Sequence, residues 1–245
     1  MLPSSIVDLS HPLQDPMTCY PGDAGFKMKS ACNFPIPNTP SQMVIVTHEL
    51  TLSTHTGTHV DAPFHFFSDG AKLSEIPLDR FVGRVVVLDV RHAAHERGRI
   101  DWVDVDTACN KASLEQIGPR SEGKVDIVLL WTGWDAHWDT PTYYAHPYFS
   151  REVAESLRNM GAQVVGMDTL GPDETPGDSE AGEVNNEGFA VHEVLLGSGR
   201  IICENLRGIG ALVGDEEVWI SMVPLSVRGS DGSPVRAYGW RQQSY

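Results

Sequence analysis

The chain has 245 residues, of which 41% are hydrophobic and 21% charged, and its formal net charge is −15. This composition predicts a globular protein with a sizeable core. The acidic balance argues against a nucleic acid or an anionic membrane surface as partner, because both are bound through clustered Lys and Arg. It is compatible with a site where carboxylates and a divalent cation neutralise one another.

The N-terminus and the cysteines indicate a cytoplasmic protein. The opening stretch, MLPSSIVDLSHPL, has no basic segment followed by a long apolar one, so we expect no signal peptide. No apolar run reaches the roughly 18 to 20 residues of a transmembrane helix. Cys19, Cys32, Cys109 and Cys203 are far apart and form no CxxC pair, which predicts reduced thiols rather than a disulfide framework or a zinc ribbon.

Three strands are predicted before residue 132. Residues 43–52, MVIVTHELTL, alternate in polarity with Val44 and Val46 on one face, which predicts a strand with a buried side. Residues 83–90 and 126–131 are near-continuous apolar runs, typical of strands buried on both faces.

The second half alternates between helix and strand. A helix is predicted over 150–160, with Ser150 at its N-cap and Gly161 ending it, and a buried strand over 162–168. Residues 172–188 are acidic and rich in Pro and Gly, which predicts a long loop and makes it a candidate lid. A helix at 189–196, a strand at 200–204 and two strands joined by a Gly-rich turn within 218–240 follow. The fold class is therefore α/β, with residues 1–245 forming a single domain.

Residues 53–66, STHTGTHVDAPFHF, concentrate candidate metal ligands in the pattern H-x-x-x-H-x-D-x-P-x-H. His55 and His59 are four residues apart, but Gly57 and Pro63 make a helix improbable, so a turn or loop must present them. Two imidazoles and the carboxylate of Asp61 suit Zn²⁺, Mn²⁺ or Fe²⁺ with positions left open for water. A single buried histidine is usually a hydrogen-bonded core residue; the whole set in one loop favours a catalytic metal site.

The pattern resembles the signature of the cyclase family of metal-dependent hydrolases, which includes kynurenine formamidases, isatin hydrolases and a dienelactone hydrolase. Four more segments are similar to that family in the same order: IVDLSHPL with YPGD, LLWTGW at 129–134, VVGMDTLGPDE at 164–174, and the His and Glu of VHEVLLGSGRIICENL. The resemblance covers nearly the whole chain. Two departures are Trp131, where the family often has Arg, and the long acidic loop.

The resemblance implies a swivelling β/β/α fold, with a mixed central sheet or partly closed barrel and flanking helices, that assembles as a homodimer or homotetramer. It also implies the ligands. His55, His59 and Asp61 would bind one Mn²⁺ or Zn²⁺, and Asp61 could bridge to a second ion held by His192 and Glu204. Read without the family, His192 is compatible with an ordinary surface histidine, whereas Glu204 follows an apolar run and needs a partner.

The expected chemistry is hydrolysis of a small amide, cyclic amide or lactone by metal-activated water. His65 is the extra imidazole, and its ordinary pKa near 6.5 suits a general acid/base. The absence of a Gly-x-Ser-x-Gly elbow argues against a serine hydrolase. Aromatic residues that are candidates to line the pocket would favour an aromatic or heteroaromatic substrate, although core packing explains them equally; they are Tyr20, Phe64, Phe66 and Trp131.

Two other functions remain open from the sequence. A metal-dependent cyclase or dehydratase acting on a small aromatic or polyketide-like compound would use the same Lewis acid and base, so only product analysis separates it from a hydrolase. A small-molecule binding protein that has lost turnover would keep the fold, although the intact histidine pattern argues against such a loss.

Overall fold

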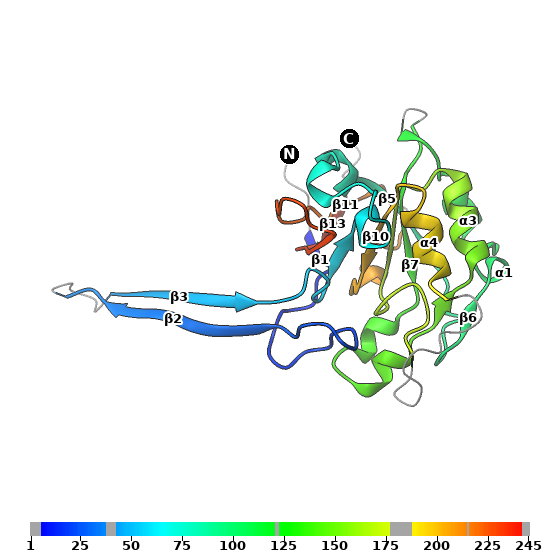
Figure 1. Cartoon of the computed structure of the whole chain (residues 1–245). Helices are drawn as coiled ribbons and strands as arrows, with labels where there is room; N and C mark the ends of the chain where they lie inside the picture. Colours follow the sequence, from blue (N-terminus) through cyan, green and yellow to red (C-terminus); the bar gives the residue numbers. More distant parts are fainter. Residues whose placement is uncertain (1–5, 38–42, 121–122, 177–187, 215, 242–245) are drawn as a thin grey trace.

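One large mixed sheet organises the chain (Figure 1). The structure, a computed structural model, describes residues 6–37, 43–120, 123–176, 188–214 and 216–241. From edge to edge, the strands are β1 (Ile6–Asp8), β13 (Tyr238–Arg241), β11 (Val218–Ser221), β5 (Val82–Asp89), β7 (Ile127–Trp131), β9 (Val164–Met167), β10 (Ile201–Glu204), β4 (His59–Asp61) and β12 (Gly232–Pro234). Neighbours from β5 to β10 are parallel and the other pairs antiparallel.

The parallel strands are buried on both faces, as their apolar runs predict. Alternate side chains of a strand point to opposite faces, and they enter two separate hydrophobic clusters. In β7, for example, Val128 and Leu130 pack on one face, whereas Ile127 and Leu129 pack on the other. The strands predicted at 83–90, 126–131, 162–168 and 200–204 are therefore confirmed.

The α-helices among the described residues are α1 (Trp102–Val105), α2 (Lys111–Leu114), α3 (Arg151–Met160) and α4 (Ala190–Leu196). α3 and α4 pack against each other and cover one face of the parallel strands (Figure 1). Gly161 ends α3 in a left-handed conformation with φ of 106°, as the sequence predicts. Ser150 precedes α3, but its side chain makes no capping hydrogen bond. A small parallel pair, β6 (Arg99–Ile100) and β8 (Tyr148–Phe149), lies apart from the main sheet.

The other face is covered by the sheet itself, which curls into a half-barrel. Residues from both ends of the strand order, such as Ile220 in β11 and Val60 in β4, join the same buried cluster. An isolated bridge between Pro224 and Val235 links the segments that follow β11 and β12. The expectation of an α/β fold with a mixed, partly closed sheet is confirmed.

Two predictions about strands are wrong in part. Residues 218–240 form three strands rather than a two-stranded hairpin, because β12 leaves β11 and pairs with β4. The strand predicted at 43–52 exists as β3 (Val44–Thr51), but all of its residues are exposed. It pairs with β2 (Lys27–Pro35), and the pair, which we call the arm, extends away from the body of the protein (Figure 1).

Most of the predicted acidic loop, residues 177–187, lies outside the described residues. Within the part of the chain that the structure describes, no helix is long and apolar enough to cross a membrane.

Candidate metal centre

Strand register brings three of the expected ligands together. β10 and β4 are antiparallel, and Glu204 at the end of β10 is paired with His59 at the start of β4. Paired residues project from the same face of a sheet, as do residues two apart on one strand. His59, Asp61 and Glu204 therefore share one face. They lie at the carboxyl end of the parallel strands, where ligand sites of open α/β sheets form.

A tight turn before β4 carries His55 to the same place. Gly57 adopts a left-handed φ of 63°, which a residue without Cβ adopts at little cost. Its carbonyl accepts hydrogen bonds from His59 Nδ1 at 2.8 Å and from Asn205 Nδ2 at 3.1 Å. The turn is thus fastened to the residue that follows β10. The prediction that a turn or loop presents His55 and His59 holds for His55, whereas His59 lies on a strand together with Asp61.

Helix α4 supplies His192 from the opposite side. Its Nδ1 lies 2.6 Å from Asp173 Oδ2, and Asp173 also accepts the backbone N–H groups of Val191 and His192. Since one ring nitrogen is held by Asp173, the other, Nε2, faces Glu204 Oε1 at 3.3 Å and Asp61 Oδ2 at 3.8 Å. Read from the sequence without the family, His192 is compatible with an ordinary surface histidine, but in the structure it is buried.

The donor atoms fit a divalent cation. His59 Nε2 lies 3.3 Å from both Asp61 Oδ1 and Glu204 Oε2, and His55 Nδ1 lies 2.7 Å from Asp61 Oδ1. His59 Nε2 and Asp61 Oδ2 are buried and have no hydrogen-bond partner among the described residues, although unpartnered buried polar atoms are costly. Imidazole nitrogens and carboxylate oxygens that converge in this way suit Zn²⁺ or Mn²⁺.

The pKa values in the cluster indicate that its carboxylates are stabilised by positive charge. Burial lowers the pKa of His55, but its hydrogen bonds with Asp231 and Asp61 outweigh burial and raise it to about 9. Burial raises the pKa of Asp61, yet the nearby imidazoles, that of His59 foremost, hold it well below its usual range. The carboxylates thus stay ionised and favour protonation of the imidazoles. A metal ion would displace these protons on binding.

His65 faces the same space without sharing that pattern. It ends the short 3-10 helix Pro63–His65, and its ring centroid lies 4.0 Å from that of His55 and 6.0 Å from that of His192. Burial lowers the pKa of His65, and the neighbouring imidazoles add to the effect. Its neutral form, which can accept a proton, is therefore favoured near neutral pH.

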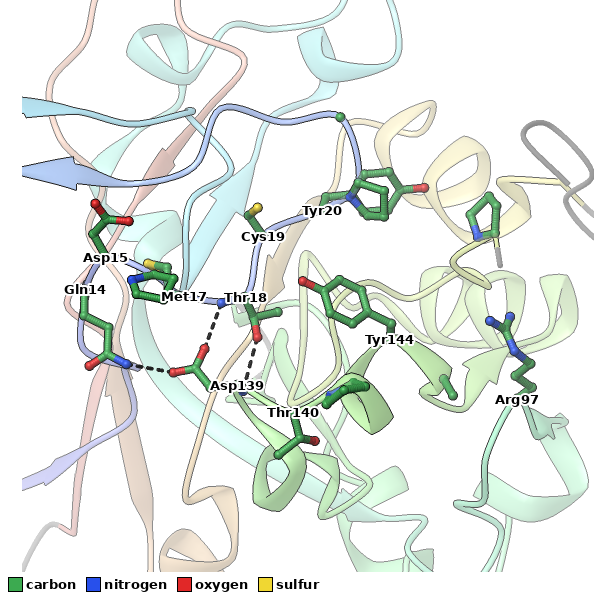
Figure 2. A pocket seen from close by; sticks show the side chains of 16 residues that line it. Gln14, Asp15, Met17, Thr18, Cys19, Tyr20, Arg97, Asp139, Thr140 and Tyr144 are labelled. Atoms are coloured by element: carbon green, nitrogen blue, oxygen red, sulfur yellow. Dashed lines mark hydrogen bonds between the residues drawn. The ribbon is translucent and has the colours of Figure 1, made fainter. Parts of the chain in front are cut away.

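The structure separates the four aromatic candidates. The ring of Phe66 stacks on that of His192, with centroids 4.6 Å apart. Tyr20 lies in a cavity of about 1020 Å³ (Figure 2), and burial together with the charge of Glu204 raises the pKa of its hydroxyl. Phe64 lies under the Lys72 ammonium group, and Trp131 stacks on the Arg91 guanidinium at 3.6 Å. The structure does not bring these last two rings to the cluster.

The cavity around Tyr20 has apolar and polar walls (Figure 2). Tyr20 and Tyr144 both pack against a small buried cluster of Trp134, Tyr143 and Leu170. On the polar side, Thr18 and Asp139 exchange two hydrogen bonds, from Thr18 N to Asp139 Oδ1 and from Asp139 N to Thr18 Oγ1. These contacts fix the loop that carries Tyr20 against the segment before Tyr144.

Sequence reasoning did not assign three polar residues around the cluster. Asp173 lies in a segment that resembles the family, but its role was not evident. Asn205 follows Glu204 without a distinguishing pattern. Asp231, which lies 2.9 Å from His55 Nε2, is part of an Asp-Gly pair that reads as an ordinary turn. Each is brought to the cluster by tertiary structure alone.

Comparison with known proteins identifies the family of the chain. The family model described as "Putative cyclase" matches residues 7–174. The chain belongs to this family. The kynurenine formamidase of Bacillus cytotoxicus is 30% identical over 97% of this chain and 98% of its own length.

Solved structures show the same fold. Isatin hydrolase A from Labrenzia aggregata, bound to benzyl benzoate, superposes with a TM-score of 0.74 at 24% identity and covers 98% of this chain and 94% of that one. Isatin hydrolase A from Ralstonia solanacearum has a TM-score of 0.75 at 23% identity, covering 97% and 92%.

Replacing His59 or Asp61 by Ala should remove the bound metal, because each contributes a buried donor atom to the cluster. Metal content after incubation with Mn²⁺ or Zn²⁺ and desalting, measured by plasma mass spectrometry, checks this outcome. His92→Ala, at an exposed histidine away from the cluster, is the matched control and should keep the wild-type metal content. Unchanged metal content in His59→Ala and Asp61→Ala would contradict the assignment.

Proposed function

We propose that the protein is a metal-dependent hydrolase of the acyl C–N bond of a small amide or cyclic amide, or of the C–O bond of a lactone. The observation that carries this proposal is the convergence of three imidazoles and two buried carboxylates at the carboxyl end of the parallel strands. The family membership and the kynurenine formamidase relative support the same class of reaction.

A divalent ion bound by His55, His59, Asp61, His192 and Glu204 would supply a nucleophilic water near neutral pH and polarise the substrate carbonyl. His65 performs the proton transfers. Its Nδ1 faces Asp231 Oδ2 at 3.3 Å, so Nε2 is the nitrogen free to take a proton from the water and return it to the leaving nitrogen or oxygen. This assignment makes His65 the catalytic general acid/base.

The ligand set has room for one or two ions. Asp61 Oδ1 lies near His55 and His59, whereas Asp61 Oδ2 faces His192. A bridging carboxylate could therefore serve a pair of ions, with Glu204, which also contacts both His59 and His192, as the second bridge. We propose Mn²⁺ or Zn²⁺, since both accept mixed nitrogen and oxygen ligands.

An aromatic or heteroaromatic substrate fits the surroundings of the site. The Phe66 ring stacks on His192, and the charge of Glu204 acts on the Tyr20 hydroxyl. Tyr20 and Tyr144 line a cavity that is large enough for a compound of two rings, although none of the cluster residues lines it. The relatives named for kynurenine formamidase and isatin hydrolase act, by their names, on such compounds. The main alternative is a ring-closing or dehydrating reaction on a similar compound, which the same groups could catalyse.

We also propose that the protein works as a homodimer built by the arm. Val44, Val46, Leu50 and Met28 lie exposed on one face of the arm, and Ile45 and Phe34 lie exposed on the other. An isolated two-stranded hairpin is marginally stable in water. A strand of nine residues is about 30 Å long. With a width of about 10 Å, two arms and the two surfaces they cover would bury roughly 1,200 Å², which is within the range of stable interfaces.

We propose a cytoplasmic location. All four cysteines are unpaired thiols, and Cys32 and Cys109 are exposed. Exposed unpaired thiols persist in a reducing compartment.

Purified protein loaded with Mn²⁺ or Zn²⁺ should hydrolyse at least one of N-formylkynurenine, isatin and a dienelactone. Product analysis by mass spectrometry separates hydrolysis from ring closure or dehydration. His59→Ala should be inactive, whereas His65→Ala should keep its metal and lose rate by roughly 10² to 10⁴-fold, the usual contribution of a general acid/base. Full rate in His65→Ala would overturn its role, and absence of turnover of all three substrates by the wild type with metal bound would contradict the proposed hydrolase function.

If the arm forms the dimer, Val46→Lys should convert the dimer into a monomer. The substitution places a charge in the apolar face that the partner copy would cover. Light scattering after size-exclusion chromatography measures the mass directly. Val46→Thr keeps the branched shape of the side chain without adding a charge and should leave the dimer intact. A wild-type monomer at micromolar concentration would contradict this mode of assembly.

A further inference from the structure

Asp231 approaches the metal centre through the register of β12. β12 pairs with β4 so that Gly232 lies opposite Asp61, and the Ala62 N–H donates to the Asp231 carbonyl oxygen at 2.8 Å. A Cβ on Gly232 would lie only 2.8 Å from His55 Cε1. The glycine therefore allows the His55 ring to lie against β12, with its outer edge toward the Asp231 side chain.

The Asp231 carboxylate contacts both His55, a candidate metal ligand, and His65, the proposed general base. Asp231 Oδ2 accepts a hydrogen bond from His55 Nε2 at 2.9 Å and lies 3.3 Å from His65 Nδ1. Its other oxygen, Oδ1, accepts from Thr54 Oγ1 at 3.0 Å. One carboxylate is thus oriented by a threonine and shared between a metal-ligand candidate and the catalytic base.

A common rule explains why such a carboxylate matters. Histidines that bind metals usually donate their second ring N–H to a carboxylate or a carbonyl, which fixes the tautomer and the ring orientation. His59 donates Nδ1–H to Gly57, and His192 donates Nδ1–H to Asp173, so each turns Nε2 inward. His55 has the opposite arrangement, because Asp231 holds Nε2 and leaves Nδ1 facing Asp61 Oδ1 at 2.7 Å.

We propose that Asp231 is a positioning residue that selects the Nδ1-inward form of His55 and aims His65 Nε2 at the same metal centre. This inference rests on the proposed function for the role of His65, whereas its effect on His55 concerns metal binding alone. Asp231 would couple binding of the metal to placement of the base. Loss of its carboxylate would then weaken both.

An alternative role for Asp231 is that of a ligand. His55, His65 and Asp231 each offer an atom within 4.8 Å of the others. However, Asp231 Oδ2 already bonds to the ring nitrogen of His55 that faces away from Asp61 and Glu204, and the side chain is one-third exposed. This geometry favours an outer support of His55 over a place in the ligand set.

Asp231→Asn tests the proposal, because it keeps the size of the side chain and removes the charge. Its Kd for Mn²⁺, measured by calorimetry on the metal-free protein, should rise by about 10- to 100-fold while the number of bound ions stays that of the wild type. At saturating Mn²⁺, kcat should fall by about tenfold or more with little change in KM, since the base rather than the substrate pocket is disturbed. Thr54→Val should shift both quantities in the same direction by a smaller factor.

Asp69→Asn, at an exposed aspartate away from the site, is the matched control and should match the wild type. Wild-type Kd and kcat in Asp231→Asn would overturn the proposal, as would loss of one bound ion, which would make Asp231 a ligand. If Asp231→Asn does not fold, wild-type values in Thr54→Val overturn it instead. If the wild type binds Mn²⁺ but hydrolyses nothing, the proposed function fails, while the Kd comparison still decides the effect on His55.

Discussion

Two carboxylates buried side by side are the constraint on which the site depends. Asp61 is 1% exposed and Glu204 is 6% exposed, and both contact His59 Nε2. Two negative charges in a low-dielectric interior repel each other and lose their hydration, so they require compensating positive charge. Protonated imidazoles supply it in the metal-free chain, and a divalent ion would supply it more compactly. Two buried carboxylates beside the imidazoles are explained by a cation site. A core of ordinary hydrogen-bonded histidines would not require them.

The topology of the sheet supports this costly cluster. The parallel strands place Glu204 at their carboxyl end, and the antiparallel β4 returns His59 and Asp61 to the same position. β12, on the far side of β4, carries Asp231 to His55. α4 is fixed to Asp173 and directs His192 inward. The ring nitrogen that points away from the cluster is held by Asp231 in His55, by the Gly57 carbonyl in His59 and by Asp173 in His192. The three imidazoles are therefore oriented before any metal binds.

Local pattern predicts the parts of the fold that depend on local interactions. The apolar runs that became β5, β7, β9 and β10, the helix that Gly161 ends, and the α/β class all follow from periodicity and turn chemistry. β3, one of the two strands of the arm, was predicted as a buried strand because its alternation indicates an apolar face, and periodicity does not reveal what covers that face. β12 was missed because its pairing with β4 spans most of the chain.

The candidate site shows the same division. The spacing of His55, His59, Asp61 and His65 is short, so the sequence displays it directly, and resemblance to the family added His192 and Glu204. Asp173, Asn205 and Asp231 lack such a pattern because their roles exist only after distant segments meet. Trp131 was a candidate to line the pocket because it is aromatic; in the structure its ring stacks on the Arg91 guanidinium, and its role in substrate binding stays a prediction.

Anomalous diffraction from crystals grown with Mn²⁺ locates the bound metal without any assumption about the substrate. We expect an anomalous peak between His59 Nε2, Asp61 and Glu204, with His55 bound through Nδ1 and His192 through Nε2. A second peak on the other side of Asp61 would establish a two-ion site. A fully ordered cluster with no anomalous peak at saturating Mn²⁺, or a metal bound only elsewhere in the chain, would show that these residues do not form a metal site.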